Sequence, residues 1–308
     1  MALTLLEGSK LSNDVLLKGV VEVVIKDSPV LQMLPFIEVV GNGLTYNKEK
    51  TLGTLDFYNV GDTWAESTPT FDQVTAVLRI LGGDADVDGL LKATRSNLND
   101  LEAQVIALKA KAAAHKFDNT FIYGDNAVRP KEWNGLIMSI DTTVVSSQVI
   151  AMAATGATLT LTKIDELCDC IKGGRPDLLL MSRRTRRKIL LLARAAGTNL
   201  QVGKGVLGQQ IEMWGTIPIG VSDWILDTHT VLASCENAKD YTGGACSTIY
   251  ALQFGPGALC GIHSPGGLQV ERVGPLETKD ATRTRIKWYN SLVLFCSLKA
   301  AALVGCQE

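Results

Sequence analysis

Residues 38–80 are the least regular part of the hydrophobic pattern, because apolar side chains are thinly spread while Gly, Thr, Asn, Asp and Val are frequent. Two strands of about 18 residues each, at roughly 3.3 Å per residue, would make a hairpin about 60 Å long. A two-stranded ribbon is only marginally stable alone in water. We therefore expect a neighbouring copy of the chain to supply its support. The candidate contact residues are the lysines and large aromatic residues of the hairpin: Lys48, Lys50, Phe57, Tyr58 and Trp64.

A helical pattern follows, from about residue 86 to residue 123. The segment contains no Pro, and its one Gly, Gly89, stands near its start. Apolar residues recur there at spacings of three and four, which predicts one narrow apolar stripe along the helix. The stripe consists of Leu98, Leu101, Val105, Leu108 and Ala112. At about 1.5 Å per residue such a helix would be roughly 50 Å long.

The remaining segments are shorter and together predict an α+β protein with mainly antiparallel sheets. A helix near residues 12–26, capped by Ser12 or Asn13 and ended by Ser28 and Pro29, belongs to an N-terminal arm. Further helices are expected at 163–172 and 183–196. A bent hairpin is expected at 211–221, and strands are expected at 159–161, 176–181, 230–233, 249–254, 268–273 and 283–295.

Composition narrows the class of protein. The 308 residues are 46% hydrophobic, which is ample for a large core, and the net charge of -2 argues against a strongly basic nucleic-acid-binding surface. The seven cysteines include no CxxC pair, so we expect reduced thiols and no disulfide. We also expect no signal peptide and no membrane partner, because no basic segment precedes an apolar run and no stretch approaches ~18 apolar residues.

One glycine-rich motif has the spacing of a dinucleotide-binding loop but fails its context. Residues 203–208 fit GxGxxG, and Asp223 stands 20 residues after the first Gly. Such a site needs a strand before the motif and a helix after it. Residues 209–214 are too few for that helix before Gly215 and Pro218. We interpret the motif as a loop and predict no cofactor.

The histidines do not form a catalytic or metal-binding pattern. His115, His229 and His263 are far apart in the sequence, and none belongs to an HExxH motif. The chain also lacks a metal-spaced Cys/His cluster and a GxSxG elbow. We therefore predict no catalytic residue and no metal ligand, and we expect a protein that is not an enzyme.

The remaining candidate for a binding site is a dense basic run, which consists of Arg183, Arg184, Arg186, Arg187 and Lys188. Two interpretations are open. The run could bind phosphates of enclosed DNA, or it could meet acidic groups of a neighbouring subunit. It opens a predicted helix, where cations oppose the helix dipole, and no aromatic residues are interleaved. These features favour the subunit contact.

Several stretches, in their order along the chain, resemble the tailed-bacteriophage major capsid protein with the Hong Kong 97-type fold. They are LLEGSKL at 5–11, SPVL at 28–31 with LPF at 34–36, LGGDADVD at 81–88, WNGL at 133–136, LMSRRTRR at 180–187 and RTRIKWY at 283–289. The resemblance covers nearly the whole chain. It implies an N-terminal arm at 1–35, an extended loop at 36–80, a peripheral domain at 81–134 and 262–290, and an axial domain at 135–261 and 291–308.

The same resemblance implies a function and partners. Such subunits form hexamers and pentamers that close into an icosahedral head around double-stranded DNA, in the virion, after assembly in the host cytoplasm. The implied partners are a portal protein, a scaffolding protein and a possible decoration or cement protein. An encapsulin-type nanocompartment shell protein is the alternative, because it shares the fold and encloses enzyme cargo.

Two departures from better-known members of the family sharpen these expectations. No helical pro-segment of about a hundred residues precedes the arm, so a separate scaffolding protein is expected. Some members join subunits by a Lys–Asn isopeptide bond. Lys48 and Lys50 could supply the amine, but Asn290 is the one Asn after Pro256, and it falls in a predicted strand. We therefore expect a shell without covalent cross-links.

Overall fold

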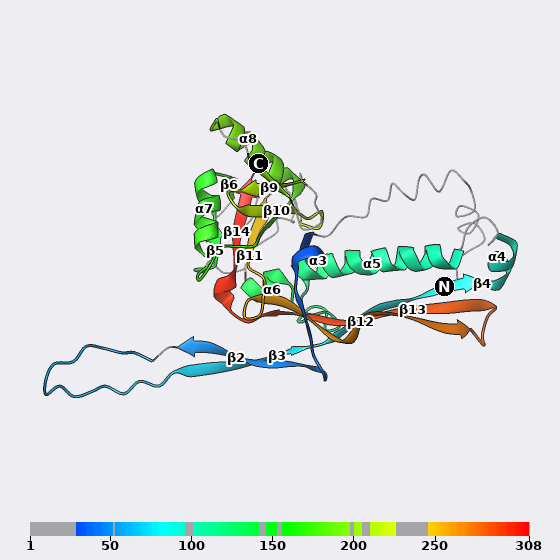
Figure 1. Ribbon diagram of the computed structural model, residues 1–308, viewed down its shortest axis with the longest axis horizontal. Helices are drawn as coiled ribbons and strands as arrows, with labels where there is room; N and C mark the ends of the chain where they lie inside the picture. The colour runs from blue at the N-terminus through cyan, green and yellow to red at the C-terminus, as the bar shows by residue number, and fades with distance from the viewer. Residues whose placement is uncertain are drawn as a thin grey trace.

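The computed structural model describes residues 29–51, 53–95, 101–141, 146–152, 156–197, 200–204, 210–225 and 246–307. These residues form two sheets, the helices packed on them and one projecting hairpin (Figure 1). The hairpin lies at one end of the long axis, and the short helix α4 (Gly89–Arg95) lies at the other. The helix expected at 12–26 and the strand expected at 230–233 fall outside the described residues.

A four-stranded sheet runs along the long axis, with the strand order β1-β12-β13-β4. Strand β1 is parallel to β12, and the other neighbours are antiparallel. The strands are β1 Phe36–Glu38, β12 Leu259–Pro275, β13 Ala281–Leu294 and β4 Arg79–Asp88. Helix α5 (Leu101–Tyr123) lies along this sheet and contacts β4 and β13. The strands expected at 268–273 and 283–295 are thus confirmed as parts of β12 and β13.

The long helix begins later than the hydrophobic pattern predicted. Residues 86–88 belong to β4, where Asp86 pairs with Arg283 of β13. The side chain of Asp88 then accepts a hydrogen bond from the Leu90 amide at 2.9 Å and caps α4. The expected helical start at residue 86 was therefore wrong, because pairing with β13 holds these residues in a strand.

The buried face of α5 also differs from the expected stripe. Val105 is buried against β4 and α4, but Leu108 and Ala112 are exposed. Leu98 lies outside the described residues. Among the side chains of α5 whose burial the structure describes, the most fully buried lie in the last two turns, which carry Phe117 and Phe121. The stripe was wrong there because its middle turns face solvent beside the sheet.

An aromatic cluster joins the end of α5 to the four-stranded sheet. Phe117 stacks on Trp288 of β13 with ring centroids 4.9 Å apart, and Phe36 of β1 lies 5.6 Å from the same ring. Trp133 packs on Phe117 at 5.5 Å and donates its Nε1 hydrogen to Asn290 Oδ1 at 3.0 Å. Aromatic pairs at such distances stabilise beyond the area that they bury. The cluster therefore fixes the strands that lead to the hairpin.

The second sheet has the order β5-β14-β11-β7-β10-β9-β8, and β6 also pairs with β14. Its strands are β5 Val149–Ala151, β14 Ala300–Gln307, β11 Ser247–Leu252, β7 Leu178–Met181, β10 Ile217–Val221, β9 Gln210–Trp214, β8 Gln201–Lys204 and β6 Ala157–Thr158. The helices beside it are α3 Pro29–Met33, α6 Leu136–Ile140, α7 Leu161–Asp169 and α8 Arg183–Ala195, and the 3₁₀ turn Ser297–Lys299 precedes β14.

The central strands of this sheet are buried on both faces. Leu178 and Leu180 of β7 join a core with α3, α5 and α6, whereas Leu179 and Met181 join a second core with α7 and α8. Strands β11 and β14 divide their residues between the two cores in the same way. Successive side chains of a strand point to opposite faces, so a strand covered on both sides needs an unbroken apolar run. This explains the runs LLLM and AAALV.

Most of the shorter predicted elements are confirmed, with shifted bounds. The helix expected at 183–196 is α8, and that expected at 163–172 is α7, which begins earlier and ends earlier. The bent hairpin expected at 211–221 is formed by β9 and β10. The strand expected at 159–161 was wrong, because the described strand is β6 and Leu161 already begins α7.

Candidate functional site

The hairpin predicted from residues 38–80 is present, but its paired part is shorter than expected. Strand β2 (Gly43–Thr51) pairs with β3 (Thr70–Val77), from Gly43 opposite Val77 to Thr51 opposite Thr70. Residues 53–69 form an extended tip outside the strands. The expectation of two strands of about 18 residues was wrong because cross-strand pairing ends at Thr51, and the tip has other contacts.

The tip, residues 53–69, is held by contacts among its own residues. Tyr58 stacks on Trp64 with ring centroids 4.9 Å apart and an interplanar angle of 16°. The Ala65 amide donates to the Tyr58 hydroxyl at 3.1 Å. The Asn59 amide donates to Asp62 Oδ2 at 2.6 Å, which closes the turn at the far end. These local bonds define a shape for the tip without help from the rest of the subunit.

Large apolar side chains on the tip have no cover in this chain. Leu55 is 98% exposed and Trp64 is 80% exposed, while Phe57 and Val60 are fully exposed. Single exposed apolar residues are common, but a group of this size on one projection is typical of a protein–protein contact. Of the sequence candidates, Phe57, Tyr58 and Trp64 therefore lie together on the tip.

The base of the hairpin is anchored to the four-stranded sheet. The Tyr46 hydroxyl donates to the Leu294 carbonyl at 3.3 Å, and its ring meets Phe295 edge-on at 4.9 Å. Burial raises the pKa of Tyr46. Lys48 Nζ lies 5.7 Å from the centroid of the Tyr46 ring, and burial lowers the pKa of this half-buried lysine. Lys48 is thus a base residue rather than a tip residue, and the side chain of Lys50 is outside the described part.

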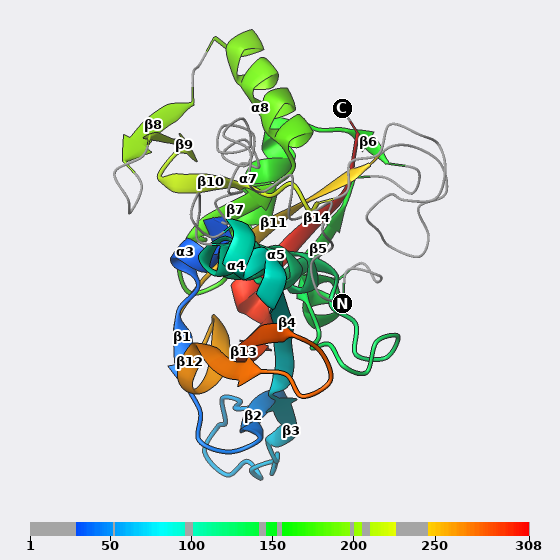
Figure 2. The same cartoon turned by 90° about the vertical axis from the view of Figure 1, so that its right-hand side faces the viewer.

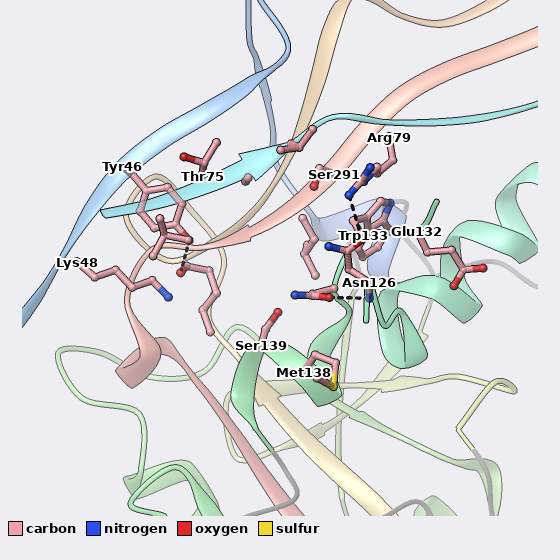
Figure 3. A pocket seen from close by; sticks show the side chains of 16 residues that line it. Tyr46, Lys48, Thr75, Arg79, Asn126, Glu132, Trp133, Met138, Ser139 and Ser291 are labelled. Atoms are coloured by element: carbon pink, nitrogen blue, oxygen red, sulfur yellow. Dashed lines mark hydrogen bonds between the residues drawn. The ribbon is translucent and has the colours of Figure 1, made fainter. Parts of the chain in front are cut away.

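A pocket of about 270 Å³ opens at this base (Figure 3). The hairpin strands, the loop after α5 and β13 all contribute to it. Its lining includes Lys48, Thr75, Arg79, Asn134, Met138 and Ser139. Arg79 donates a hydrogen bond to Asn126 Oδ1 at 3.0 Å, which holds its guanidinium at the wall. The pocket wall is therefore mainly polar and carries two cationic side chains.

The arginine run lies at the start of α8, far from the hairpin. Figure 2 shows α8 at one extreme of the molecule and β2 and β3 at the other. Ser182 caps the helix by accepting from the Thr185 amide at 3.2 Å. Arg187 is exposed and Arg184 is half-buried. The structure thus separates the candidate residues into a hairpin group and an α8 group.

Two of these arginines have acidic partners within the same chain. Arg183 donates to both carboxylate oxygens of Asp223, at 2.5 and 3.1 Å. Arg186 donates to both oxygens of Glu212, at 2.6 and 2.8 Å, and this bond raises the pKa of Arg186. The acidic partners were expected on a neighbouring subunit. For Arg183 and Arg186 they lie within the same chain, because β9 carries Glu212 and β10 leads to Asp223 beside α8.

Sequence reasoning missed an ordered set of charges between β4 and β13. Asp86 accepts from Arg283 at 2.7 and 2.8 Å and from Lys279 at 2.6 Å, and these bonds hold the pKa of Asp86 well below its usual range. Asp84 likewise accepts from Arg285, at 2.7 and 3.0 Å. The signal was visible as a D-x-D opposite an R-x-R, since alternate residues of paired strands share a face.

The glycine-rich motif and two of the histidines, which the sequence did not assign to a functional site, lie among ordinary structural contacts. The GxGxxG stretch begins in β8, which pairs with β9, so the described chain has no helix directly after it. Among the described residues, no group of three His, Cys, Asp or Glu could hold a metal ion. His115 packs beside Trp224, and His263 lies against Phe36. In the part of the chain that the structure describes, no helix is long and apolar enough to cross a membrane.

The chain matches a protein family in its sequence and several solved structures in its fold. Residues 9–226 match the phage capsid family. No curated protein sequence matches the chain. Similar solved structures include the holo-SrpI encapsulin complex from Synechococcus elongatus PCC 7942, with a TM-score of 0.69, 15% identity and 96% of both chains covered. The Cyanophage A-1(L) capsid asymmetric unit has a TM-score of 0.68 at 14% identity, covering 91% of this chain and 93% of that chain. Mycobacterium phage Bobi has a TM-score of 0.61 at 15% identity, with 100% of both chains covered.

These findings differ in what they establish. The structural likenesses are at low identity, and they show the fold alone. The fold, with its projecting hairpin, long helix and two sheets, is the Hong Kong 97-type fold that the sequence motifs indicated. The family match covers well over half of the chain. The chain therefore belongs to the phage capsid family and is a capsid shell protein.

Proposed function

We propose that copies of this chain form hexamers and pentamers, and that these close into an icosahedral phage head around double-stranded DNA. The observation that carries the proposal is the tip, which has a defined shape but leaves Leu55, Phe57, Val60 and Trp64 uncovered. Apolar groups of this kind are stabilised at ~25 cal/mol per Å² when a partner removes them from water. A neighbouring subunit is that partner.

The two sheets correspond to two parts of such a subunit. We assign the four-stranded sheet and α5 to the peripheral domain, residues 81–134 and 262–290. We assign the second sheet with α7 and α8 to the axial domain, residues 135–261 and 291–308, which meets its copies at the centre of a capsomer. The hairpin then belongs to the extended loop, residues 36–80, and residues 1–35 to the N-terminal arm.

The α8 arginines fit a subunit contact better than a DNA contact. Arg183 and Arg186 are already neutralised by Asp223 and Glu212, which leaves less positive charge for phosphates. The exposed edges of these bidentate ion pairs can still form hydrogen bonds with a second subunit. Residues Arg184 and Arg187 extend the same face of charge.

The proposed setting includes further partners. Assembly would take place in the host cytoplasm with a scaffolding protein, a portal protein would occupy one vertex, and a decoration or cement protein would bind the finished head. Packaged DNA would be held without sequence specificity. No enzymatic activity of the subunit is needed for any of these roles. Subunits would be held without covalent cross-links, because Asn290 is fully buried in β13.

The test removes the tip and keeps its anchor. Residues 52–69 are replaced by Asn-Gly, which supports a two-residue turn between the paired Thr51 and Thr70. We expect a folded subunit by circular dichroism that forms no closed shells by negative-stain electron microscopy. The control is Val202→Ser, an exposed apolar residue on β8 outside the proposed contacts, which should assemble normally. Normal shells from the tip-replaced protein would contradict the proposal.

An encapsulin-type shell is the second candidate, favoured by the structural likeness over 96% of both chains. The two functions differ in what the particle encloses. Particles purified from infected cells, which supply the other head proteins, should contain double-stranded DNA that is protected from nuclease if the phage-head proposal is right. Uniform small particles that enclose a co-purifying enzyme and no DNA would support the encapsulin function instead.

A further inference from the structure

The tip of the hairpin is uniformly acidic in its charged residues. Residues 53–69 include Asp56, Asp62 and Glu66 but no Lys, Arg or His. Asp62 is occupied by the Asn59 amide at the turn. Asp56 and Glu66 form no hydrogen bond or ion pair with any other described residue. The projection therefore presents carboxylates beside its exposed apolar side chains.

The pocket at the base of the hairpin has the opposite character. Lys48 and Arg79 line it as cations. Its carboxylate, Glu132, already accepts from Lys116 at 2.6 Å and from Arg129 at 3.2 Å. Lys48 lies against the Tyr46 ring and, among the described residues, has no carboxylate partner. Lys48 and Arg79 are thus half-buried cations that, among the described residues, are not paired with a carboxylate.

The tip and the pocket of one subunit cannot meet. The tip lies at the far end of the hairpin (Figure 1). The pocket is lined by the strands at the base of the hairpin and by Met138 and Ser139 of α6. The strands between them are paired along their length and cannot fold back. The tip that could bring its carboxylates to this pocket is therefore that of a second copy of the chain.

We propose that the base pocket of one subunit receives the acidic tip of the next, with Asp56 and Glu66 facing Lys48 and Arg79. This inference rests on the proposed function and names the surface on which the hairpin lands. Phe57 and Trp64 would lie against Met138, an exposed apolar residue at the pocket, while Thr75, Asn134 and Ser139 supply hydrogen bonds. The contact uses two different surfaces, so it runs head to tail and forms a ring when the rotation between neighbours closes.

Charge reversal tests the contact. The base variant Lys48→Glu/Arg79→Glu and the tip variant Asp56→Lys/Glu66→Lys should each raise the concentration needed for assembly by about tenfold or more. The variant with all four changes restores attraction with swapped signs, so it should recover assembly. Matched controls are Glu49→Lys on the hairpin stem and Lys131→Glu on the loop after α5, both exposed and outside the pocket. Circular dichroism of the unassembled subunit shows whether each variant is folded.

A measurement on the wild-type chain keeps the proposal testable if a variant fails to fold. Shells assembled from isotopically labelled and unlabelled subunits are treated with a carbodiimide, which joins a carboxylate to an amine in contact. We expect mixed-label peptides that link Asp56 or Glu66 to Lys48. Cross-links elsewhere with none at Lys48 would overturn the inference.

Other outcomes separate this inference from the proposed function. If the base variant assembles like the wild type while the tip-replaced protein does not, the hairpin lands elsewhere and the pocket proposal fails alone. If the base variant forms normal shells that fail to retain DNA, the pocket binds phosphate and not the tip. A four-change variant that is folded yet remains unassembled would also overturn the pairing.

Discussion

The hairpin tip and the central strands of the second sheet are stabilised in opposite ways. Residues 53–69 are ordered by a few local bonds and expose large apolar side chains, whereas β7, β11 and β14 are buried on both faces between two cores. The strands obtain their stability within the subunit. The tip has a shape within the subunit but buries little, so most of its stabilisation is left for assembly. Folding and assembly are therefore assigned to separate residues.

The largest expected effect on folding comes from the buried side of this comparison. Phe117→Ala removes a ring that contacts Trp288 and Trp133, and it should lower the free energy of unfolding by about 3–5 kcal/mol. Urea denaturation of the unassembled subunit measures the change. Phe57→Ala on the tip is the control and should stay within about 0.5 kcal/mol of the wild type. Equal losses for the two variants would break the comparison.

The charge pairs between β4 and β13 predict an acid-sensitive element on the folding side. The depressed pKa of Asp86 means that its stabilising contribution is complete above the ordinary aspartate value near 4. That contribution is lost as the pH falls through the lower folded-state value. Asp86→Asn should therefore destabilise the subunit at neutral pH and remove up to about one proton of uptake on acid unfolding.

Asp84→Asn is the control for this prediction, because Asp84 has a weaker set of partners and is more exposed. Unfolding curves at several pH values below 5 give the proton uptake of each variant. A pH dependence of Asp86→Asn that matches the wild type would show that Asp86 does not supply the effect.

A smaller effect is expected at the start of α8. Ser182→Ala removes the oxygen that accepts from the Thr185 amide and should cost about 1 kcal/mol of folding stability. Thr160→Ala at the start of α7 is the matched control, because Thr160 makes no capping hydrogen bond with its side chain. Thermal unfolding followed by circular dichroism ranks the two. A larger loss at Thr160 would contradict the assignment of the cap.

The smallest effect on folding should accompany a clear effect on assembly. Phe57→Ser/Val60→Ser changes fully exposed side chains, so the free energy of unfolding should move by less than about 0.5 kcal/mol. Shell yield, measured by sedimentation, should nevertheless fall strongly. Val202→Ser on β8 is the control, with a similarly exposed side chain far from the hairpin. Unchanged shell yield in the tip variant would remove the sharpest difference between the two regions.

The sequence predicted elements whose pattern arises locally. The run in β7 and the basic helix start of α8 were readable because each depends on neighbouring residues. The strand β14 was not predicted, although it is central to the second sheet. The polar stretch 38–80 also indicated a projecting hairpin, since it has too few apolar residues to pack into a compact core. These successes rest on periodicity and on turn and cap chemistry.

The misses arise where distant segments decide the structure. Asp86 belongs to a strand because β13, almost two hundred residues later, supplies Arg283. Arg186 meets Glu212 only because β9 returns beside α8. The base pocket joins β2, β3, the loop after α5 and β13, and no local pattern marks it. Lys48 was singled out as a candidate contact residue, yet its position against Tyr46 could be seen only in three dimensions.

The anchor at Tyr46 gives the hairpin the mechanics of a lever. From Tyr46 to the turn at Gly61, where φ is 97°, an extended chain covers roughly 50 Å at about 3.3 Å per residue. A rotation of about 5° at the anchor then moves the turn by about 4 Å, which exceeds the length of a hydrogen bond. The hydrogen bond and ring contact of Tyr46 hold the hairpin there, together with the packing of Leu44, Ala76 and Leu78 on the four-stranded sheet. In the proposed shell, a slight adjustment there would let the same sequence reach neighbours at different angles while both cores keep their packing.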